Sequence, residues 1–188
     1  YQGGKYYDNG NYKESLLKYK YANTLNPLNG RVLFNLGVNY YILGFYEDAE
    51  QIFKESIKYH NDKVIYGNLG LCYMKMGDYQ RAEEAFKYAI YLDPQFSKAS
   101  SDLGLLYFKK GNYNGAIEQW GKILEIDPDF SENYIILTNL GVVYQKKEMP
   151  DKALEYFVQA LQLVPEGSPI EDEIEKEINK IYKSKLKN

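Results

Sequence analysis

Few residues in this sequence are of the types that carry out nucleophilic, acid–base or metal chemistry. It contains one histidine, His60, and one cysteine, Cys72. These counts exclude a multi-histidine metal site, a cysteine-based zinc site and an intrachain disulfide. Glu83 and Glu84 are adjacent, and adjacent helical residues do not face each other, so they form no catalytic carboxylate pair. We expect His60 in a turn, Cys72 as a small buried hydrophobe, and no enzyme activity, cofactor or metal ion.

The overall composition narrows the class of protein further. The 188 residues carry a net charge of −3, and Arg31 and Arg81 are the only arginines, which argues against binding of nucleic acid. No apolar run approaches the roughly 20 residues that span a membrane. The chain begins at Tyr1 with neither a methionine nor a signal-peptide pattern. We read it as a piece of a longer protein of unknown compartment, with the cytoplasm as the default.

A repeated block organises the chain. Four segments of 19 residues align without gaps, and a partial copy precedes them; they begin at Asn35, Asn68, Asp102, Asn139 and Gln2. Within one block, Leu69 and Tyr73 share a helical face, and Gly77-Asp78 has the residues of a helix end followed by a helix cap. Each block therefore predicts two helices joined by a tight turn. One such pair is too small to bury its own apolar face, so neighbouring pairs must stack.

The repeated positions resemble those of the tetratricopeptide repeat, a helix–turn–helix unit of about 34 residues. The first-helix glycine of that family corresponds to Gly3, Gly37, Gly70, Gly104 and Gly141. Its second-helix aromatic residue corresponds to Tyr19, Phe53, Phe86, Trp120 and Phe157. The resemblance covers residues 1–167 and implies an all-α, right-handed superhelical solenoid of helix–turn–helix repeats.

We expect five repeat units and a C-terminal helix. The units are 1–29 (a truncated first unit), 30–62, 63–96, 97–133 and 134–167, and the capping helix and tail occupy 168–188. The cap is predicted because Ile170, Ile174, Ile178 and Ile181 form one apolar stripe. We expect no such cap on the first unit, because Tyr1 falls inside its predicted first helix.

The fifth unit departs from the pattern at two places. Three extra residues precede it, close to one helical turn, and we expect them to lengthen its first helix, with Asp129 or Ser131 as the cap. Glu148 and Pro150 replace the glycine and tyrosine of the turn between its helices. Proline suits the first turn of a helix, so we expect the hairpin to be retained.

The resemblance also indicates where a partner would bind, because the first helices of successive repeats line a concave groove in this family. Four positions relative to the signature glycine share one helix face: two residues before it, and one, four and five after it. Counted in this way, and with Arg31 and Lys98 added, the candidate residues are Asn35, Asn68, Asp102, Asn139, Val38, Leu71, Leu105, Val142, Tyr41, Met74, Phe108, Gln145, Lys75, Lys109 and Lys146. The sequence does not separate groove from core among the apolar ones.

The column of Asn35, Asn68 and Asn139 resembles the asparagine ladder of peptide-binding members of the family. An asparagine amide both donates and accepts hydrogen bonds, so such a ladder can hold the main chain of an extended peptide. Asp102 interrupts it, because a carboxylate only accepts. The alternative is that asparagine is common in this chain and the column serves local packing. We do not expect the family's carboxylate clamp, because Val38 stands where that clamp has asparagine.

The predicted function is a non-enzymatic protein–protein interaction module, a scaffold or adaptor, that binds an extended peptide segment in the groove. Lysines on the groove positions invert the negative charge of the chain, which favours a partner segment with acidic residues. The alternative is a structural, self-associating or spacer module of a longer protein.

Overall fold

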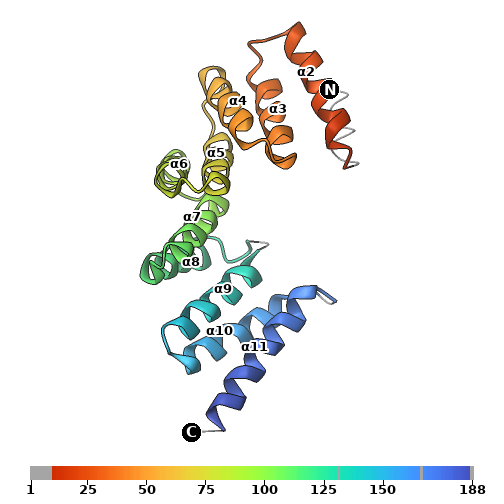
Figure 1. The fold of residues 1–188 in the computed structure, drawn as a ribbon. Helices are drawn as coiled ribbons and strands as arrows, with labels where there is room; N and C mark the ends of the chain where they lie inside the picture. Colours follow the sequence, from red (N-terminus) through yellow and green to blue (C-terminus); the bar gives the residue numbers. More distant parts are fainter. Residues whose placement is uncertain (1–9, 131, 166, 187–188) are drawn as a thin grey trace. The chain divides into compact units, whose positions relative to one another are not determined.

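The computed structural model describes residues 10–130, 132–165 and 167–186, and within them ten α-helices follow one another with no strand. The helices are α2 (Tyr12–Leu25), α3 (Gly30–Ile42), α4 (Tyr46–Tyr59), α5 (Lys63–Met76), α6 (Tyr79–Leu92), α7 (Ser97–Lys109), α8 (Tyr113–Ile126), α9 (Asn133–Lys146), α10 (Pro150–Leu163) and α11 (Pro169–Lys185) (Figure 1). The predicted all-α fold of helix pairs is confirmed. Gly3, Ser131 and the predicted uncapped start of the first unit lie outside the described residues.

The chain divides into two compact units, Tyr1–Leu106 and Tyr107–Asn188. Helices α2 to α6 and most of α7 belong to the first unit, and α8 to α11 belong to the second. In both units the closest contacts lie between a helix and its neighbour in the chain, such as α3 with α4 and α9 with α10.

A glycine on the first helix and an aromatic ring on the second make the tightest contact of a pair. A Cβ placed on Gly37 would lie 2.7 Å from the ring of Phe53, and one placed on Gly141 would lie 2.5 Å from the ring of Phe157. Both rings are completely buried, as is the alanine at the small position that opens each second helix from α4 to α10. The predicted small and aromatic positions therefore form the core, because two helices can approach this closely only where one of them has no side chain.

The turns inside the pairs use the left-handed backbone region. Gly77 ends α5 with a φ of 79°, and the Asp78 side chain accepts a hydrogen bond from the backbone N–H of Arg81 to cap α6. Between α9 and α10 the corresponding residue is Glu148, with a φ of 58°, and Pro150 is the first residue of α10. The prediction that this hairpin is retained is confirmed.

The prediction that the extra residues lengthen α9 is wrong. Helix α9 has 14 residues, as many as α5, and its N-cap is Glu132, whose side chain makes no capping hydrogen bond, so Asp129 does not cap it. The described residues before the helix, from Asp127 to Phe130, instead form a turn, in which the backbone N–H of Phe130 donates a hydrogen bond to the carbonyl of Asp127. The buried side chain of Asn133 donates a hydrogen bond of 2.7 Å to the carbonyl of Pro128. The same side chain also donates to the carbonyl of Asp127, so it satisfies two carbonyls of the turn that precedes the helix.

Helix α11 covers the last helix pair, as predicted. Ile174 and Ile181 are buried in one cluster with Phe157 and Ala160 of α10 and Leu137 of α9. Figure 1 shows α11 beside α10 in the second unit. The isoleucine stripe therefore closes the apolar side of the final repeat.

Candidate functional site

The structure places nearly all of the predicted binding residues at the surface. The five basic candidates are exposed: Arg31, Lys75, Lys98, Lys109 and Lys146. The others are partly buried, namely Asn35, Asn68, Asn139, Val38, Tyr41, Leu71, Met74, Leu105, Phe108, Val142 and Gln145. Asp102 is the exception, at 8% exposed. A partly buried side chain that still meets solvent is suited to contact a ligand.

The boundary between groove and core falls between neighbouring positions of the first helices. The residue two after the signature glycine is completely buried in α3, α5, α7 and α9, where it is Asn39, Cys72, Leu106 and Val143. The residue one after the glycine is only partly buried in the same helices, as for Val38 and Leu71. Burial raises the pKa of the Cys72 thiol to about 12, so this group is an inert part of the core, as predicted.

Two amides of the predicted ladder hydrogen-bond to their own helices. The Asn35 side-chain nitrogen donates to the carbonyl of Arg31 at 3.0 Å, and that of Asn68 donates to the carbonyl of Val64 at 2.8 Å. Such hydrogen bonds within a helix are what we expect if the asparagine column serves local packing. Each amide has a second N–H hydrogen and a carbonyl oxygen, so one donor and one acceptor can still be offered to a ligand.

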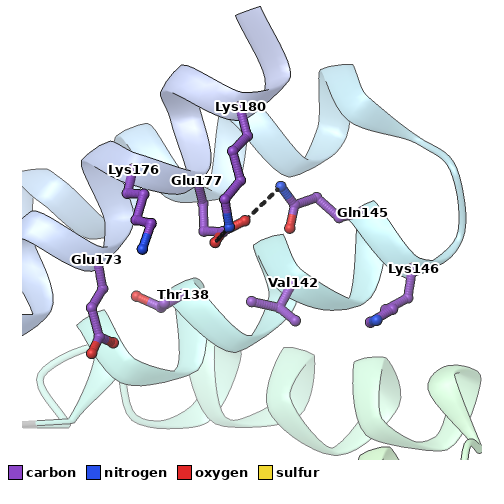
Figure 2. Close-up of a pocket in the computed structure, with 8 residues that line it drawn as sticks. All are labelled: Thr138, Val142, Gln145, Lys146, Glu173, Lys176, Glu177 and Lys180. Carbon is purple, nitrogen blue, oxygen red and sulfur yellow. Dashed lines mark hydrogen bonds and ion pairs between the residues drawn. The ribbon is translucent and has the colours of Figure 1, made fainter. Parts of the chain in front are cut away.

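A cavity of about 530 Å³ lies between α9 and α11 in the second unit (Figure 2). Its α9 side contains three predicted binding residues and Thr138, and its α11 side is charged; the lining residues are Thr138, Val142, Gln145, Lys146, Glu173, Lys176, Glu177 and Lys180. The α11 residues were not predicted, because the isoleucine stripe of that helix indicates only a cap. The repeat length could have found them, since Lys180 follows Lys146 by 34 residues.

One carboxylate of this cavity is already neutralised by its neighbours. Glu177 accepts a hydrogen bond of 3.2 Å from the side chain of Gln145 and forms an ion pair with Lys180. Burial favours the neutral acid, but these hydrogen bonds and the nearby charges of Lys180 and Lys176 hold the pKa of Glu177 below its usual value. Its negative charge therefore contributes little to what the cavity presents to a ligand.

A second, smaller cavity of about 210 Å³ lies in the first unit and brings Arg31 together with apolar residues. It is lined by Arg31, Phe34, His60, Asp62, Val64 and Ile65. His60 is exposed in the turn before α5, as predicted, with its Nε2 atom 3.6 Å from a carboxylate oxygen of Asp62. An apolar lining with charged residues around it suits a single apolar side chain of a partner.

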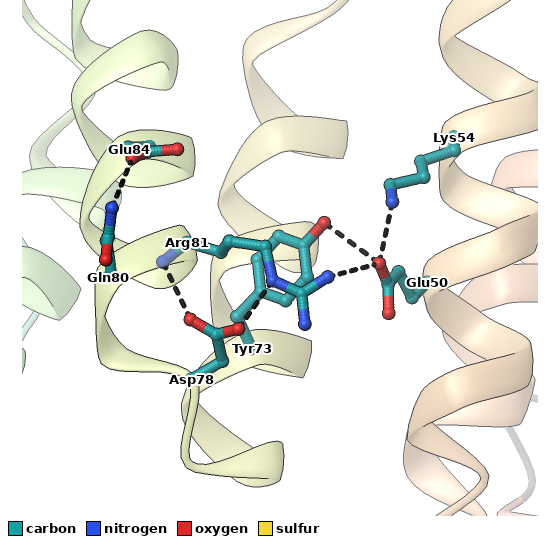
Figure 3. A network of polar contacts seen from close by, with 7 residues as sticks. All are labelled: Glu50, Lys54, Tyr73, Asp78, Gln80, Arg81 and Glu84. Atoms are coloured by element: carbon teal, nitrogen blue, oxygen red, sulfur yellow. Dashed lines mark hydrogen bonds and ion pairs between the residues drawn. The ribbon is translucent and has the colours of Figure 1, made fainter.

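A polar network joins three helices of the first unit (Figure 3). A carboxylate oxygen of Glu50 on α4 accepts hydrogen bonds from Lys54 at 2.7 Å, from the Tyr73 hydroxyl at 3.1 Å and from Arg81 at 3.0 Å. The Arg81 guanidinium also lies over the Tyr73 ring, 4.5 Å from its centre. Burial opposes ionisation, but these hydrogen bonds and positive charges hold the pKa of Glu50 below its usual value. The network fixes one helix pair against the next and contains none of the predicted binding residues.

The described residues include no group of three or more histidine, cysteine, aspartate or glutamate side chains placed to hold a metal ion. None of the helices described is both long and apolar enough to cross a membrane.

Comparison with protein families identifies the repeat. Three family models match, and each is described as a tetratricopeptide repeat: one at residues 64–96 and 134–166, one at 104–148 and one at 3–62. The chain is a tetratricopeptide repeat protein. Members of this family are protein-interaction modules, so a protein is the class of partner to expect. A search of curated proteins found no match.

Solved structures of other tetratricopeptide repeat proteins share the fold. MamA is 29% identical over 86% of this chain and 93% of its own, with a TM-score of 0.74. YrrB, described as a tetratricopeptide repeat protein with an unusual peptide-binding site, is 21% identical over 88% of this chain and 84% of its own, with a TM-score of 0.67. A Thermus thermophilus repeat protein is 20% identical over 94% and 95%, with a TM-score of 0.76. The last two likenesses concern the fold alone.

Proposed function

We propose that this protein binds an extended segment of a partner protein on the face that the first helices present within each unit. One observation carries the proposal: the amide, aliphatic and lysine positions recur in register on successive first helices and meet solvent there. The residues packed in the core occupy neighbouring positions on the same helices, such as Leu69 and Cys72 on α5. A surface built only for packing needs no such recurrence of accessible side chains.

The first unit illustrates how a segment would be held. Asn35 and Asn68 each offer one remaining N–H hydrogen and a carbonyl oxygen to a peptide main chain. Val38 and Leu71, partly buried beside them, supply apolar contact area, and the exposed Lys75 supplies positive charge. Main-chain hydrogen bonds give affinity regardless of sequence, whereas the apolar and charged positions select side chains. YrrB, a fold relative described as having a peptide-binding site, supports this use of the repeat.

The test is a selection of random displayed peptides on the full chain, followed by an NMR titration of the recovered peptide. The methyl signals of Val38 and Leu71 are expected to shift, while the signals of Gln51, on the exposed face of α4, stay unchanged. A peptide that shifts only second-helix signals such as those of Gln51 would contradict the proposal.

Self-association is the second candidate function, and the exposed face of α2 favours it. Leu17, Tyr21 and Leu25 lie one turn apart, and they are 59%, 65% and 70% exposed. The position of Leu17 is polar in every later second helix, where it is Gln51, Glu84, Glu118 and Glu155. Exposed apolar residues in one continuous stripe are typical of an interaction surface.

Sedimentation equilibrium over a hundredfold range of concentration distinguishes this candidate from the first. If α2 mediates self-association, the wild-type chain forms oligomers and the double variant Leu17→Glu, Tyr21→Glu is monomeric. A wild-type chain that is monomeric throughout the range excludes self-association.

A further inference from the structure

Helix α11 follows α9 in the register of the repeat. Adding 34 residues, the length of one unit, moves each groove position of α9 onto an α11 residue. Asn139, Val142, Gln145 and Lys146 become Glu173, Lys176, Asn179 and Lys180. The same step carries the core residue Leu140 onto Ile174, and both are buried. Helix α11 therefore occupies the register of a further first helix and places polar and charged residues at its groove positions.

The cavity between α9 and α11 agrees with this register independently. Three of the four α11 groove positions line it, namely Glu173, Lys176 and Lys180. They lie opposite three of the four groove residues of α9, namely Val142, Gln145 and Lys146 (Figure 2). The isoleucine stripe faces the core, so one helix both closes the repeat and extends the binding face by one step.

The charges in this cavity favour an anion. Its lining contains three lysines and two glutamates. Glu177 is neutralised by Lys180 and held by Gln145, which leaves Lys146 and Lys176 against Glu173. Lys146 and Lys176 are exposed, so their ammonium groups can reorient toward a ligand without breaking a buried contact. Val142 and Thr138 supply an apolar surface and a methyl group beside them.

We propose that this cavity binds a carboxylate of the bound segment, either an acidic side chain or a free C-terminus. Lys176 contacts the carboxylate, Lys146 adds positive charge, and Val142 contacts the aliphatic stem of the ligand. Gln145 is a positioning residue, because its side chain donates a hydrogen bond to the Glu177 carboxylate, which also forms the ion pair with Lys180. The inference rests on the proposed function, since it assigns one end of the peptide-binding face.

Three pentapeptides, two with blocked ends and one with a free C-terminus, test the proposed carboxylate site. The first has a glutamate between pairs of alanines and blocked ends, the second has glutamine in its place, and the third is all alanine with a free C-terminal carboxylate. Each is titrated into the isotope-labelled full chain, and the methyl signals of Val142 and Thr138 are followed. At least one carboxylate peptide is expected to shift these signals and to bind about fivefold or more tightly than the glutamine peptide. The tighter of the two identifies the source of the carboxylate.

Two variants locate the effect. Lys176→Gln is expected to remove the preference for the carboxylate peptide, while Lys122→Gln, on α8 and paired with Glu118, leaves it unchanged. Equal binding of the glutamine peptide and both carboxylate peptides, an unchanged preference in Lys176→Gln, or no shift at Val142 would each overturn the carboxylate site. The proposed function is judged separately, because peptides selected by display can still shift Leu71 of the first unit when Val142 does not respond.

Discussion

The ring of Phe86 fills the space that a side chain on Gly70 would need. A Cβ on Gly70 would lie 2.6 Å from Cε1 of that ring, and the ring is completely buried. Real Cβ atoms do not approach a carbon this closely, so α5 and α6 can pack as they do only while residue 70 is glycine. The same close contact joins Gly37 to Phe53 and Gly141 to Phe157. The glycine and the aromatic residue of the family signature are therefore explained by how the two helices of a pair pack.

Gly70→Ala is therefore expected to destabilise the protein by about 1–3 kcal/mol, because the ring or the helix must move. Gly121→Ala is the matched control. Gly121 also lies inside a helix, α8, but nothing lies within 4 Å of a Cβ placed there. That variant should gain about 0.5–1 kcal/mol from helix propensity. Urea unfolding of both variants measures the difference, and a loss of equal size in both would contradict the steric explanation.

The turn between α9 and α10 offers a second test. Glu148 has a positive φ of 58°, where Gly77 and Gly111 occur in the equivalent turns. A non-glycine residue in this region costs about 1–2 kcal/mol, so Glu148→Gly should raise the free energy of unfolding by about 0.5–1 kcal/mol after the entropic cost of glycine. Gly77→Ala should lower it by a similar amount. Thermal melts of the two variants are expected to move in opposite directions.

Helix α11 is expected to stabilise the final repeat through its buried stripe. Ile174 is completely buried, and removing a buried isoleucine side chain to alanine typically costs about 2–5 kcal/mol. Tyr182 on the same helix is exposed, so Tyr182→Ala should change stability by less than about 0.5 kcal/mol. If Ile174→Ala unfolds at the same urea concentration as the wild type, α11 does not act as a cap.

The Glu50 network predicts a pH dependence with a defined sign. The folded state lowers the pKa of Glu50, so this carboxylate stabilises the fold above its unfolded pKa. That contribution is lost as the pH falls through the lowered folded value. Glu50→Gln should therefore be less stable than the wild type at pH 7, and the difference should narrow toward pH 3. A difference that is constant between the two pH values would show that the charge of Glu50 plays no part.

The parts of the molecule that periodicity controls were predictable from the sequence. The glycine–aromatic pairs, the turns and the isoleucine stripe follow from local spacing, and each is found where the repeat places it. The turn before α9 was not predictable, because it depends on hydrogen bonds from the Asn133 side chain to the carbonyls of Asp127 and Pro128, which no repeated position of the sequence indicates. The division between Val38 and Asn39 was not predictable either, since adjacent residues of one helix differ in burial only through their neighbours in space. The groove residues of α11 could have been predicted by a step of one repeat length from α9. The isoleucine stripe of that helix, however, predicts only a capping role.

The peptide-binding proposal makes its sharpest prediction through two residues of α5 that differ in charge. Asn68 would pair with main-chain groups of a bound segment, and an interaction between neutral partners depends little on salt. Lys75 is exposed, and its attraction to acidic side chains is screened within about 10 Å at 0.1 M salt. A neutral hydrogen bond contributes about 0.5–1.5 kcal/mol, so Asn68→Ala should weaken binding of a display-selected peptide by roughly 2- to 10-fold at every salt concentration. Lys75→Ala should weaken it at low salt and match the wild type at high salt.

Calorimetric titration at two ionic strengths measures the affinities of both variants. If Asn68→Ala binds as tightly as the wild type, the amide serves only its hydrogen bond to the carbonyl of Val64, and the local-packing interpretation of the asparagine column is correct.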